Sequence, residues 1–172
     1  VVHIWRKQRD SGGPITITDS RMTRFIITME EAVHFTKQSI DLMQGGEIFV
    51  PKLPVASMVD LAQAVRDEHG WRHNALIYSG LRPGGEKLHE ILLSQEEPKR
   101  TIPVVSGMAF SEGISYFLVQ PSHRSWSSEP YDNCPMGDPL AEGFVYSSLS
   151  APKLDRETLR KIVQAVPKTQ EE

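Results

Sequence analysis

Cysteine is almost absent from the sequence. An excess of positive charge, an apolar run of membrane length and a signal peptide are also missing, and each absence excludes a class of protein. The one cysteine among 172 residues, Cys134, excludes an intrachain disulfide and favours a reducing compartment. No basic neighbour lies beside it in "YDNCPMGDP", which argues against a catalytic thiolate. The formal net charge is −3, so the composition indicates no cationic surface for nucleic acid or anionic lipid. No apolar run reaches the length of a membrane span and no signal peptide is recognisable, so we expect a cytoplasmic protein.

The motifs of several catalytic classes are also missing. The six histidines are scattered and neither HExxH nor CxxC occurs, so we expect no metal site. No GxSxG marks a nucleophilic serine, and no glycine-rich turn has the spacing of a dinucleotide-binding loop. None of the four tyrosines is followed by a lysine four positions later, as a tyrosine–lysine redox pair would require. The sequence therefore carries neither a complete catalytic apparatus nor a cofactor site.

What the sequence does contain is a regular alternation of helical and extended patterns. Thr28 with Glu31 forms a capping box, and Ser57 and Asp155 are N-cap residues of later helices. The patterns predict helices near 1–11, 28–45, 57–70 and 155–166, and strands near 14–18, 47–52, 74–80 and 114–121. The helix–strand–helix–strand order of residues 28–79 predicts an α/β layer with parallel pairing. Residues 121–143 read as a long loop, and residues 167–172 as a frayed tail.

Two details of these patterns are specific enough to test. In the second helix, Ala32, Phe35, Ile40 and Met43 are predicted to lie near one face, with Gly45 closing the helix. The charged runs "WRKQR" and "QEEPKR" are short or mix signs, so we interpret them as solvated faces.

Two arginines in rigid settings are the strongest chemical signal. Arg24 lies in the extended, otherwise apolar run "RMTRFIIT". Arg82 lies in "GLRPGGEKLHE", a Pro-Gly-Gly turn that precedes a predicted helix start, with Glu86 just beyond it. A guanidinium at a fixed position suits phosphate oxygens, and a nearby carboxylate accepts hydrogen bonds from ribose hydroxyls. The alternative is that each arginine pairs with a local carboxylate such as Asp19 or Glu86.

At these residues the chain resembles a known family. The blocks "RMTRFIITMEEAV", "GGEIFVPKLP", "DLAQAV", "GLRPGGEKLHE" and "EGFVYSS" are similar, in order and spacing, to the C-terminal part of bacterial UDP-N-acetylglucosamine 4,6-dehydratases. The similarity is greatest to the inverting, 5-epimerising members, which act in pseudaminic acid and flagellin-sugar biosynthesis, and it runs from about Val1 to about Val163. These enzymes are extended short-chain dehydrogenases. The resemblance implies that residues 1–172 are an α/β substrate-binding region with a mixed small sheet, and that the NADP-binding half is absent from the chain.

The resemblance also assigns roles to individual residues. Arg24 and Arg82 match the two arginines that contact the diphosphate, and Glu86 matches the acid that holds the ribose. Thr16 and Ile17 match the segment beside the uracil, where backbone groups act, and Val1 is expected near the base. The family turn reads Arg-Pro-Gly-Glu-Lys, and this chain has one additional glycine, Gly85, directly before Glu86.

The chemistry implied is that of the intact enzyme. A bound NADP takes hydride from C4 of the sugar, water is lost across C5 and C6, and hydride returns at C6, without a metal. Because the chain begins Val-Val, we expect a fragment whose catalytic Asp, Lys and Tyr lie upstream. The expected partners are UDP-N-acetylglucosamine or a similar UDP-sugar and further copies in a homo-oligomer such as a hexamer, with no nucleic acid or membrane. Other epimerases or dehydratases of the same superfamily, a non-catalytic UDP-sugar-binding module and a degenerate remnant remain as alternatives.

Overall fold

The fold was obtained as a computed structural model that describes residues 1–68, 75–105, 114–123 and 140–167. Cys134, most of the predicted loop 121–143 and all but the first residue of the predicted tail 167–172 lie outside these ranges. The chain divides into two compact units. Unit 1 comprises residues 1–26, 54–90 and 151–172, and unit 2 comprises residues 27–53 and 91–150.

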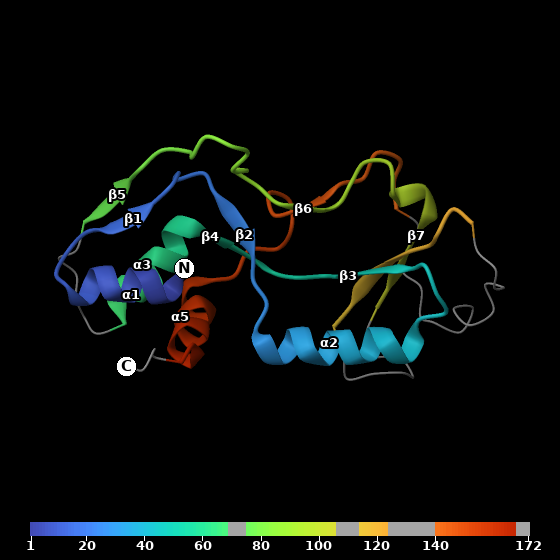
Figure 1. The fold of residues 1–172 in the computed structure, drawn as a ribbon, viewed down its shortest axis with the longest axis horizontal. Helices are drawn as coiled ribbons and strands as arrows, with labels where there is room; N and C mark the ends of the chain where they lie inside the picture. Colours follow the sequence, from blue (N-terminus) through green and yellow to red (C-terminus); the bar gives the residue numbers. More distant parts are fainter. Residues whose placement is uncertain (69–74, 106–113, 124–139, 168–172) are drawn as a thin grey trace. The chain divides into compact units, whose positions relative to one another are not determined.

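Unit 1 packs three helices against two pairs of short strands (Figure 1). Its elements are α1 (Val2–Asp10), β1 (Ile15–Ile17), β2 (Thr23–Phe25), β4 (Val55–Ser57), α3 (Met58–Asp67), β5 (Leu76–Tyr78) and α5 (Arg156–Ala165). Strands β1 and β5 pair in parallel, with Thr16 opposite Ile77. Strands β2 and β4 pair antiparallel, with Arg24 opposite Ala56. The Ser57 and Asp155 side chains accept hydrogen bonds from the third residue of α3 and α5, so both predicted N-caps are confirmed.

The core of unit 1 is apolar and combines one face of each helix with the inward side chains of β1. The apolar residues Leu61, Ala62 and Val65 form the buried face of α3 and are at most 4% exposed. The remaining members of this core are Trp5, Ile15, Ile17, Met22, Ala56, Met58, Ala64, Leu159 and Val163.

A buried ionic cluster fastens α1 to the C-terminal ends of α3 and α5. Arg6 and Arg9 are 6% and 2% exposed, so the solvated face predicted for "WRKQR" is wrong at these two positions. Both guanidinium groups bind the Glu68 carboxylate, Arg6 through Nε at 3.0 Å and Arg9 through Nη1 at 2.7 Å. Arg6 also donates to the carbonyl of Val163 at 2.6 Å, and Arg9 to that of Val65 at 2.9 Å. The arginines therefore neutralise one carboxylate and donate to carbonyls in the last turns of α3 and α5, where positive charge is favourable.

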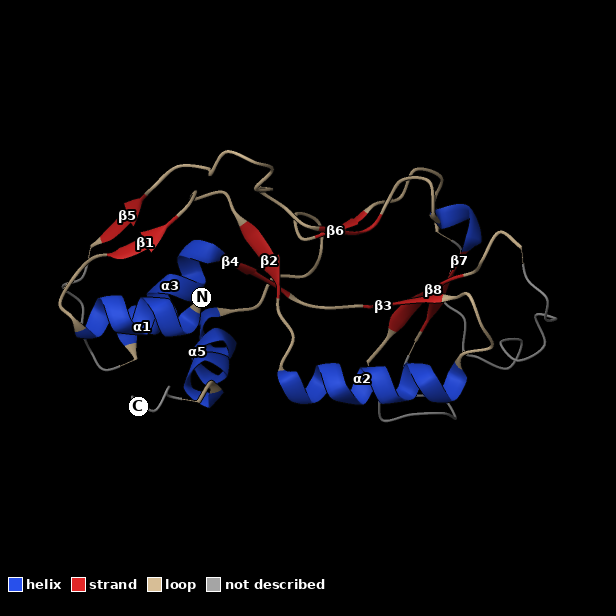
Figure 2. Cartoon of the chain, in the orientation of Figure 1, coloured by secondary structure: helices blue, strands red, loops and turns tan. Residues whose placement is uncertain are grey.

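Unit 2 contains a three-stranded antiparallel sheet, in the order β3-β8-β7, with α2 along one face (Figure 2). Its elements are α2 (Met29–Leu42), β3 (Ile48–Pro51), β6 (Ile91–Leu93), the 3-10 turn η1 (Pro98–Arg100), β7 (Thr101–Val104), β8 (Tyr116–Val119) and β9 (Tyr146–Ser147). Pro51 and Pro103 lie on the outer strands β3 and β7, where a missing N–H is tolerated. Phe35 of α2 packs edge-on against Tyr116 of β8, with ring centroids 5.9 Å apart.

Three predictions about local structure need correction. The parallel layer expected for residues 28–79 does not form, because β3 pairs antiparallel with β8 and β5 pairs with β1. The expectation overlooked β4, which is the strand that directly precedes α3 and which pairs with β2.

The helix start predicted after the glycine turn is also wrong. The carbonyls of Lys87 and Leu88 accept hydrogen bonds from Arg24, and that of Leu88 also from the Thr23 N–H, so they are not used in a helix.

The third correction concerns α2. The capping box of Thr28 and Glu31 is confirmed, and Phe35 is buried. Ile40 and Met43, however, are 61% and 52% exposed and do not share the buried face. At about 100° per residue, Ile40 lies roughly 140° around the helix from Phe35, so the spacing places them on different faces.

Candidate functional site

A cavity of about 740 Å³ lies within unit 1, and all six residues that the sequence assigned to substrate binding line it. These six are Val1, Thr16, Ile17, Arg24, Arg82 and Glu86. Its volume is within the range of about 300–1,000 Å³ that is usual for small-molecule sites. The wall is built from the N-terminal end and one face of α1, from β1 and β2, and from the turn after β5.

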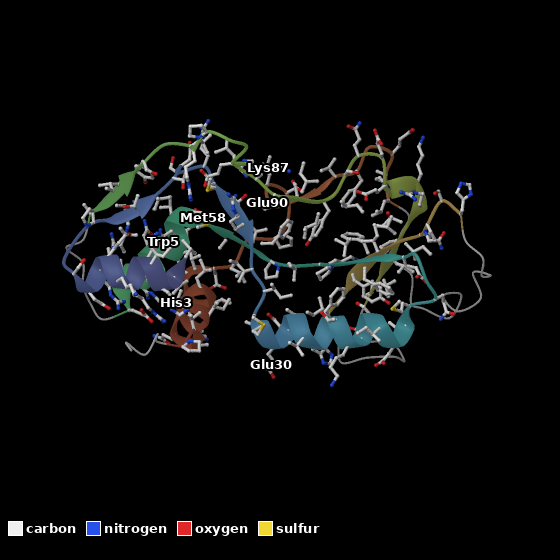
Figure 3. All side chains as sticks on the ribbon, viewed as in Figure 1. His3, Trp5, Glu30, Met58, Lys87 and Glu90 are labelled. Atoms are coloured by element: carbon white, nitrogen blue, oxygen red, sulfur yellow. The ribbon has the colours of Figure 1, made fainter. Side chains whose placement is uncertain are left out.

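Strand β2 and the segment after the turn hold Arg24 in one position. Its Nη1 donates to the carbonyl of Thr23 at 2.7 Å and to that of Leu88 at 3.1 Å, and Nη2 donates to the carbonyl of Lys87 at 2.9 Å. Nε lies 3.5 Å from a carboxylate oxygen of Glu90, and Figure 3 shows Lys87 and Glu90 near β2. The side chain is only 25% exposed, so the guanidinium is oriented before any ligand arrives.

The turn that carries Arg82 is closed by Glu86. Gly84 and Gly85 have φ values of +111° and +102°, a conformation that side-chain-bearing residues rarely adopt. The turn brings Glu86 back so that one carboxylate oxygen accepts from the Arg82 backbone N–H at 3.0 Å. The other oxygen accepts from the Thr18 hydroxyl at 3.4 Å. The additional glycine is thus accommodated in the left-handed region, and Glu86 still lines the cavity.

Charge in the turn favours the ionised form of Glu86. The hydrogen bond from the Arg82 backbone, and then the charges of Arg82 and Arg24, hold the pKa of Glu86 below its ordinary value despite partial desolvation. The ionised carboxylate is a pure acceptor, which suits a pair of donating hydroxyls. The Arg82 side chain is 79% exposed, whereas that of Glu86 is 18% exposed. The guanidinium therefore extends into solvent while the carboxylate stays against the wall.

The pairing of arginines with local carboxylates is present, but it is weak. Arg82 Nη2 lies 3.5 Å from Glu86, and Arg24 Nε lies 3.5 Å from Glu90. Distances of this length are at the outer limit of hydrogen bonding, and exposed pairs contribute little. Asp19 pairs with neither of them, because Arg21 occupies it at 2.8 Å. The Arg82 fork accordingly remains able to bind an anion, and Arg24 keeps one N–H of Nη2 that the backbone carbonyls of the described residues do not use.

Helix α1 is docked on β1 through the backbone of Thr16. The Trp5 indole N–H donates to the Thr16 carbonyl at 2.8 Å, and the Gln8 side-chain oxygen accepts from the Thr16 N–H at 3.0 Å. The Ile17 carbonyl accepts from the Ser79 N–H at 2.9 Å. The backbone groups that the resemblance suggested for a base contact are thus already engaged within the protein.

Sequence reasoning missed several residues of the cavity wall. These are Ile4, Trp5, Gln8, Thr18, Met22, Met58, Ser79, Gly80, Leu81 and Pro83. Trp5 and Met58 both belong to the core of unit 1, and both are labelled in Figure 3. For α1 a signal was available, because positions 1, 4, 5 and 8 follow the spacing of a single helical face.

Two further features, a metal-binding cluster and a membrane-spanning helix, are absent from the described ranges. There, no group of three or more histidine, cysteine, aspartate or glutamate side chains is arranged to hold a metal ion. Within the same ranges, every helix is too short or too polar to cross a membrane.

Comparison with known proteins places this site in context. The family described as polysaccharide biosynthesis protein matches residues 1–111. An inverting UDP-N-acetylglucosamine 4,6-dehydratase from Campylobacter jejuni is 34% identical over 153 residues, which is 88% of this chain and 42% of the relative. The chain belongs to the polysaccharide biosynthesis protein family. The predicted membership of the extended short-chain dehydrogenases is thereby confirmed.

One further sequence relative and one solved structure agree with this assignment. The capsular polysaccharide biosynthesis protein CapD of Staphylococcus aureus is 41% identical over 101 residues, 56% of this chain and 16% of its own length. The crystal structure of Pen from Bacillus thuringiensis superposes with a TM-score of 0.75 at 25% identity, covering 95% of this chain and 45% of that one. The predicted fold class, an α/β portion of an extended short-chain dehydrogenase with small sheets and helices, is confirmed. The chain spans less than half the length of each of these relatives.

Proposed function

We propose that the cavity of unit 1 binds the UDP part of a UDP-sugar, and that the chain is the substrate-binding half of a UDP-N-acetylglucosamine 4,6-dehydratase. The observation that carries the proposal is the convergence of Arg24, Arg82 and Glu86, from two distant segments, on one cavity. The identity of 34% with an enzyme of that name supports the choice of substrate.

In this proposal each residue has a physical task. The exposed guanidinium of Arg82 exchanges its long contact with Glu86 for phosphate oxygens. Arg24 offers the one N–H of Nη2 that the backbone carbonyls leave unused in the described part of the chain. Glu86, ionised because its pKa is lowered, accepts hydrogen bonds from the ribose hydroxyls. Binding energy gathered at the diphosphate then orients the hexose at a distance from it.

The chemical step in this proposal belongs to groups outside these residues. NADP, when bound to the intact enzyme, would accept a hydride from the sugar and later return it, and the catalytic Asp, Lys and Tyr would come from the half that the relatives have in addition. The chain alone should bind nucleotide without turnover. The product of the complete enzyme would be a 4-keto-6-deoxy sugar nucleotide used for cytoplasmic synthesis of surface or flagellar glycan precursors, including pseudaminic acid, by a homo-oligomer.

The test is calorimetric titration of the chain with UDP. Arg82→Ala should lose about 1.5–3 kcal/mol of binding free energy, the contribution of one charge-assisted contact. Arg21→Ala is the matched control, because Arg21 is 67% exposed and pairs with Asp19. UMP should bind more weakly than UDP to the unmodified chain. Equal UDP affinity in the Arg82→Ala and Arg21→Ala variants would exclude the proposed phosphate contact.

A further inference from the structure

Helix α2 carries a continuous stripe of exposed, mostly apolar side chains. Its members are Met29, Val33, Thr36, Ile40 and the C-cap residue Met43, of which the four apolar ones are 52–80% exposed. Successive members are four, three, four and three residues apart, which is the heptad spacing of the contact positions in a coiled coil. The buried side chain of α2, Phe35, lies roughly 120° around the helix from the middle of this stripe. The stripe is therefore separate from the face that α2 packs into the core of unit 2.

A hollow of about 270 Å³ lies beside the C-terminal half of the stripe. Its wall includes Phe35 and three members of the stripe, Thr36, Ile40 and Met43. In a coiled coil, such a hole receives a side chain from the facing helix. Met29 is long, flexible and 80% exposed, and methionine fills irregular gaps of this kind. Because Met29 lies about 16 Å from Ile40 along the same helix, it can fill this hollow only in a second copy of the chain.

We propose that α2 pairs with α2 of a second copy of this chain in an antiparallel two-helix contact, a surface independent of the nucleotide site proposed above. In this register Met29 faces Ile40 of the second copy, and Val33 faces Thr36 of the second copy. The two-fold symmetry repeats each contact, so each copy places its Met29 at the hollow of the other. The Thr36 hydroxyl donates to the Ala32 carbonyl at 2.8 Å, so it keeps its hydrogen bond when the stripe is covered.

Charges beside the stripe select this register. Glu30 and Lys37 lie on the same flank of α2, next to Met29 and Thr36, and Figure 3 shows Glu30 at the first turn. Among the described residues, neither charged side chain has a hydrogen bond or an ion pair, and both are exposed.

The proposed register gives both charges a partner. Glu30 of each copy comes beside Lys37 of the other, which makes two ion pairs at the edge of the contact. Sliding one helix by seven residues would instead place Lys37 beside Lys37 of the second copy, which is repulsive. A parallel arrangement would place Lys37 beside Ala32 of the second copy and leave Glu30 without an opposite charge. The antiparallel register is thus the one in which apolar and charged contacts agree.

The contact is small, so we expect reversible association. Helix α2 has 14 residues, and a pair of helices of this length buries less than about 1,200 Å², at the low end of specific interfaces. A weak contact responds measurably to a change in two ion pairs, particularly at low salt, where exposed charges are least screened.

The experiment is sedimentation equilibrium, at low salt, of the chain and of three variants: Glu30→Lys, Lys37→Glu and the double variant that carries both. Each single reversal sets like charges against each other in both ion pairs and should weaken the dimer by about tenfold. The double variant recreates both pairs with exchanged signs, so its dissociation constant should return to within about threefold of the original. Glu157→Lys is the matched control, because Glu157 is also exposed in the first turn of a helix, and it should leave association unchanged.

The outcomes separate this contact from other modes of association. A chain that stays monomeric up to about 1 mM overturns the proposal. A dimer of equal affinity in all the variants uses another surface, which overturns it as well. Weakening by each single reversal without recovery in the double variant refutes the antiparallel register. If Glu30→Lys fails to fold, Lys37→Glu tests the same ion pairs alone, and an unchanged dissociation constant in that variant refutes the pairing.

Discussion

Replacing Glu68 by glutamine should destabilise unit 1 severely. The side chain is 6% exposed and shared by Arg6 and Arg9, themselves 6% and 2% exposed. The neutral amide would leave the buried Arg6 without its counter-charge, would leave Arg9 with only the exposed Asp10, and would set its own NH₂ against one guanidinium. Removing one partner of a buried ion pair costs about 3–5 kcal/mol, against a total stability of about 5–15 kcal/mol. At about 2–4 °C per kcal/mol, the melting temperature should fall by roughly 6–20 °C.

The assay is urea denaturation followed by circular dichroism, with Glu157→Gln as control. Glu157 is 79% exposed and pairs with Lys161 within α5, so its replacement should change stability by no more than about 0.5 kcal/mol. A loss below about 1 kcal/mol for Glu68→Gln would mean that the cluster does not secure the fold and would refute the reasoning.

The dependence on pH gives a second check on the same cluster. Burial raises the pKa of Glu68, but the hydrogen bonds and charges of Arg6 and Arg9 outweigh burial, so the folded-state pKa lies below the ordinary value of 4.5. A carboxylate with a lowered folded pKa stabilises the protein above its unfolded pKa, and this stabilisation is lost as the pH falls through the folded value. The difference between the unmodified chain and Glu68→Gln should therefore be constant near neutral pH and shrink only in acid. A difference that stays constant through the acid range would contradict the assigned cause.

Two further predictions concern unit 2. Tyr146→Phe removes a hydroxyl that accepts from the Leu53 N–H at 2.7 Å and donates to the Leu53 carbonyl at 2.9 Å, so it should cost about 1–3 kcal/mol for each buried group left without a partner. Urea denaturation measures this loss, and Tyr78→Phe, at a side chain 54% exposed, is the control. Ile40→Lys, at an exposed site among Met29, Val33 and Met43 on α2, should reduce self-association in sedimentation experiments and leave the melting temperature within a few degrees. Unchanged sedimentation would show that this apolar face does not drive association.

Local signals in the sequence were sufficient for the helices, whereas the strand pairing was not predictable. The capping box at Thr28 and the caps at Ser57 and Asp155 depend on residues only three positions away. They can therefore be recognised from the sequence alone. The partners of β3 and β5 lie on β8 and β1, far along the chain, and alternation of helices and strands does not specify them. The short strands β4, β6 and β9 have two or three residues each and carry almost no periodicity.

The site shows the same division between local and distant information. Arg24, Arg82 and Glu86 stood out because their residue types and turn are unusual and match a family pattern. The burial of Arg6 was not predictable, because its partners Glu68 and Val163 are 62 and 157 positions away. Gln8 was overlooked because a single glutamine in a charged helix has no distinguishing pattern, and its place on the cavity wall follows from its contact with Thr16.

Unit 1 is built from three separate segments of the chain, so its parts leave the ribosome at different times. Its cavity wall begins with α1 at the first residues of the chain, yet the carbonyls that hold Arg6 belong to α5 and the residues just after it, at positions 163–167. Translation proceeds at about 5–20 residues per second. Several seconds or more therefore pass between the synthesis of α1 and that of the α5 carbonyls to which Arg6 donates. Unit 2 is synthesised during that interval, because its residues 27–53 and 91–150 lie between the first and last segments of unit 1 in the sequence. A premature stop before α5 would remove the carbonyls to which Arg6 donates, and such a product should be a preferred target for chaperones and proteases.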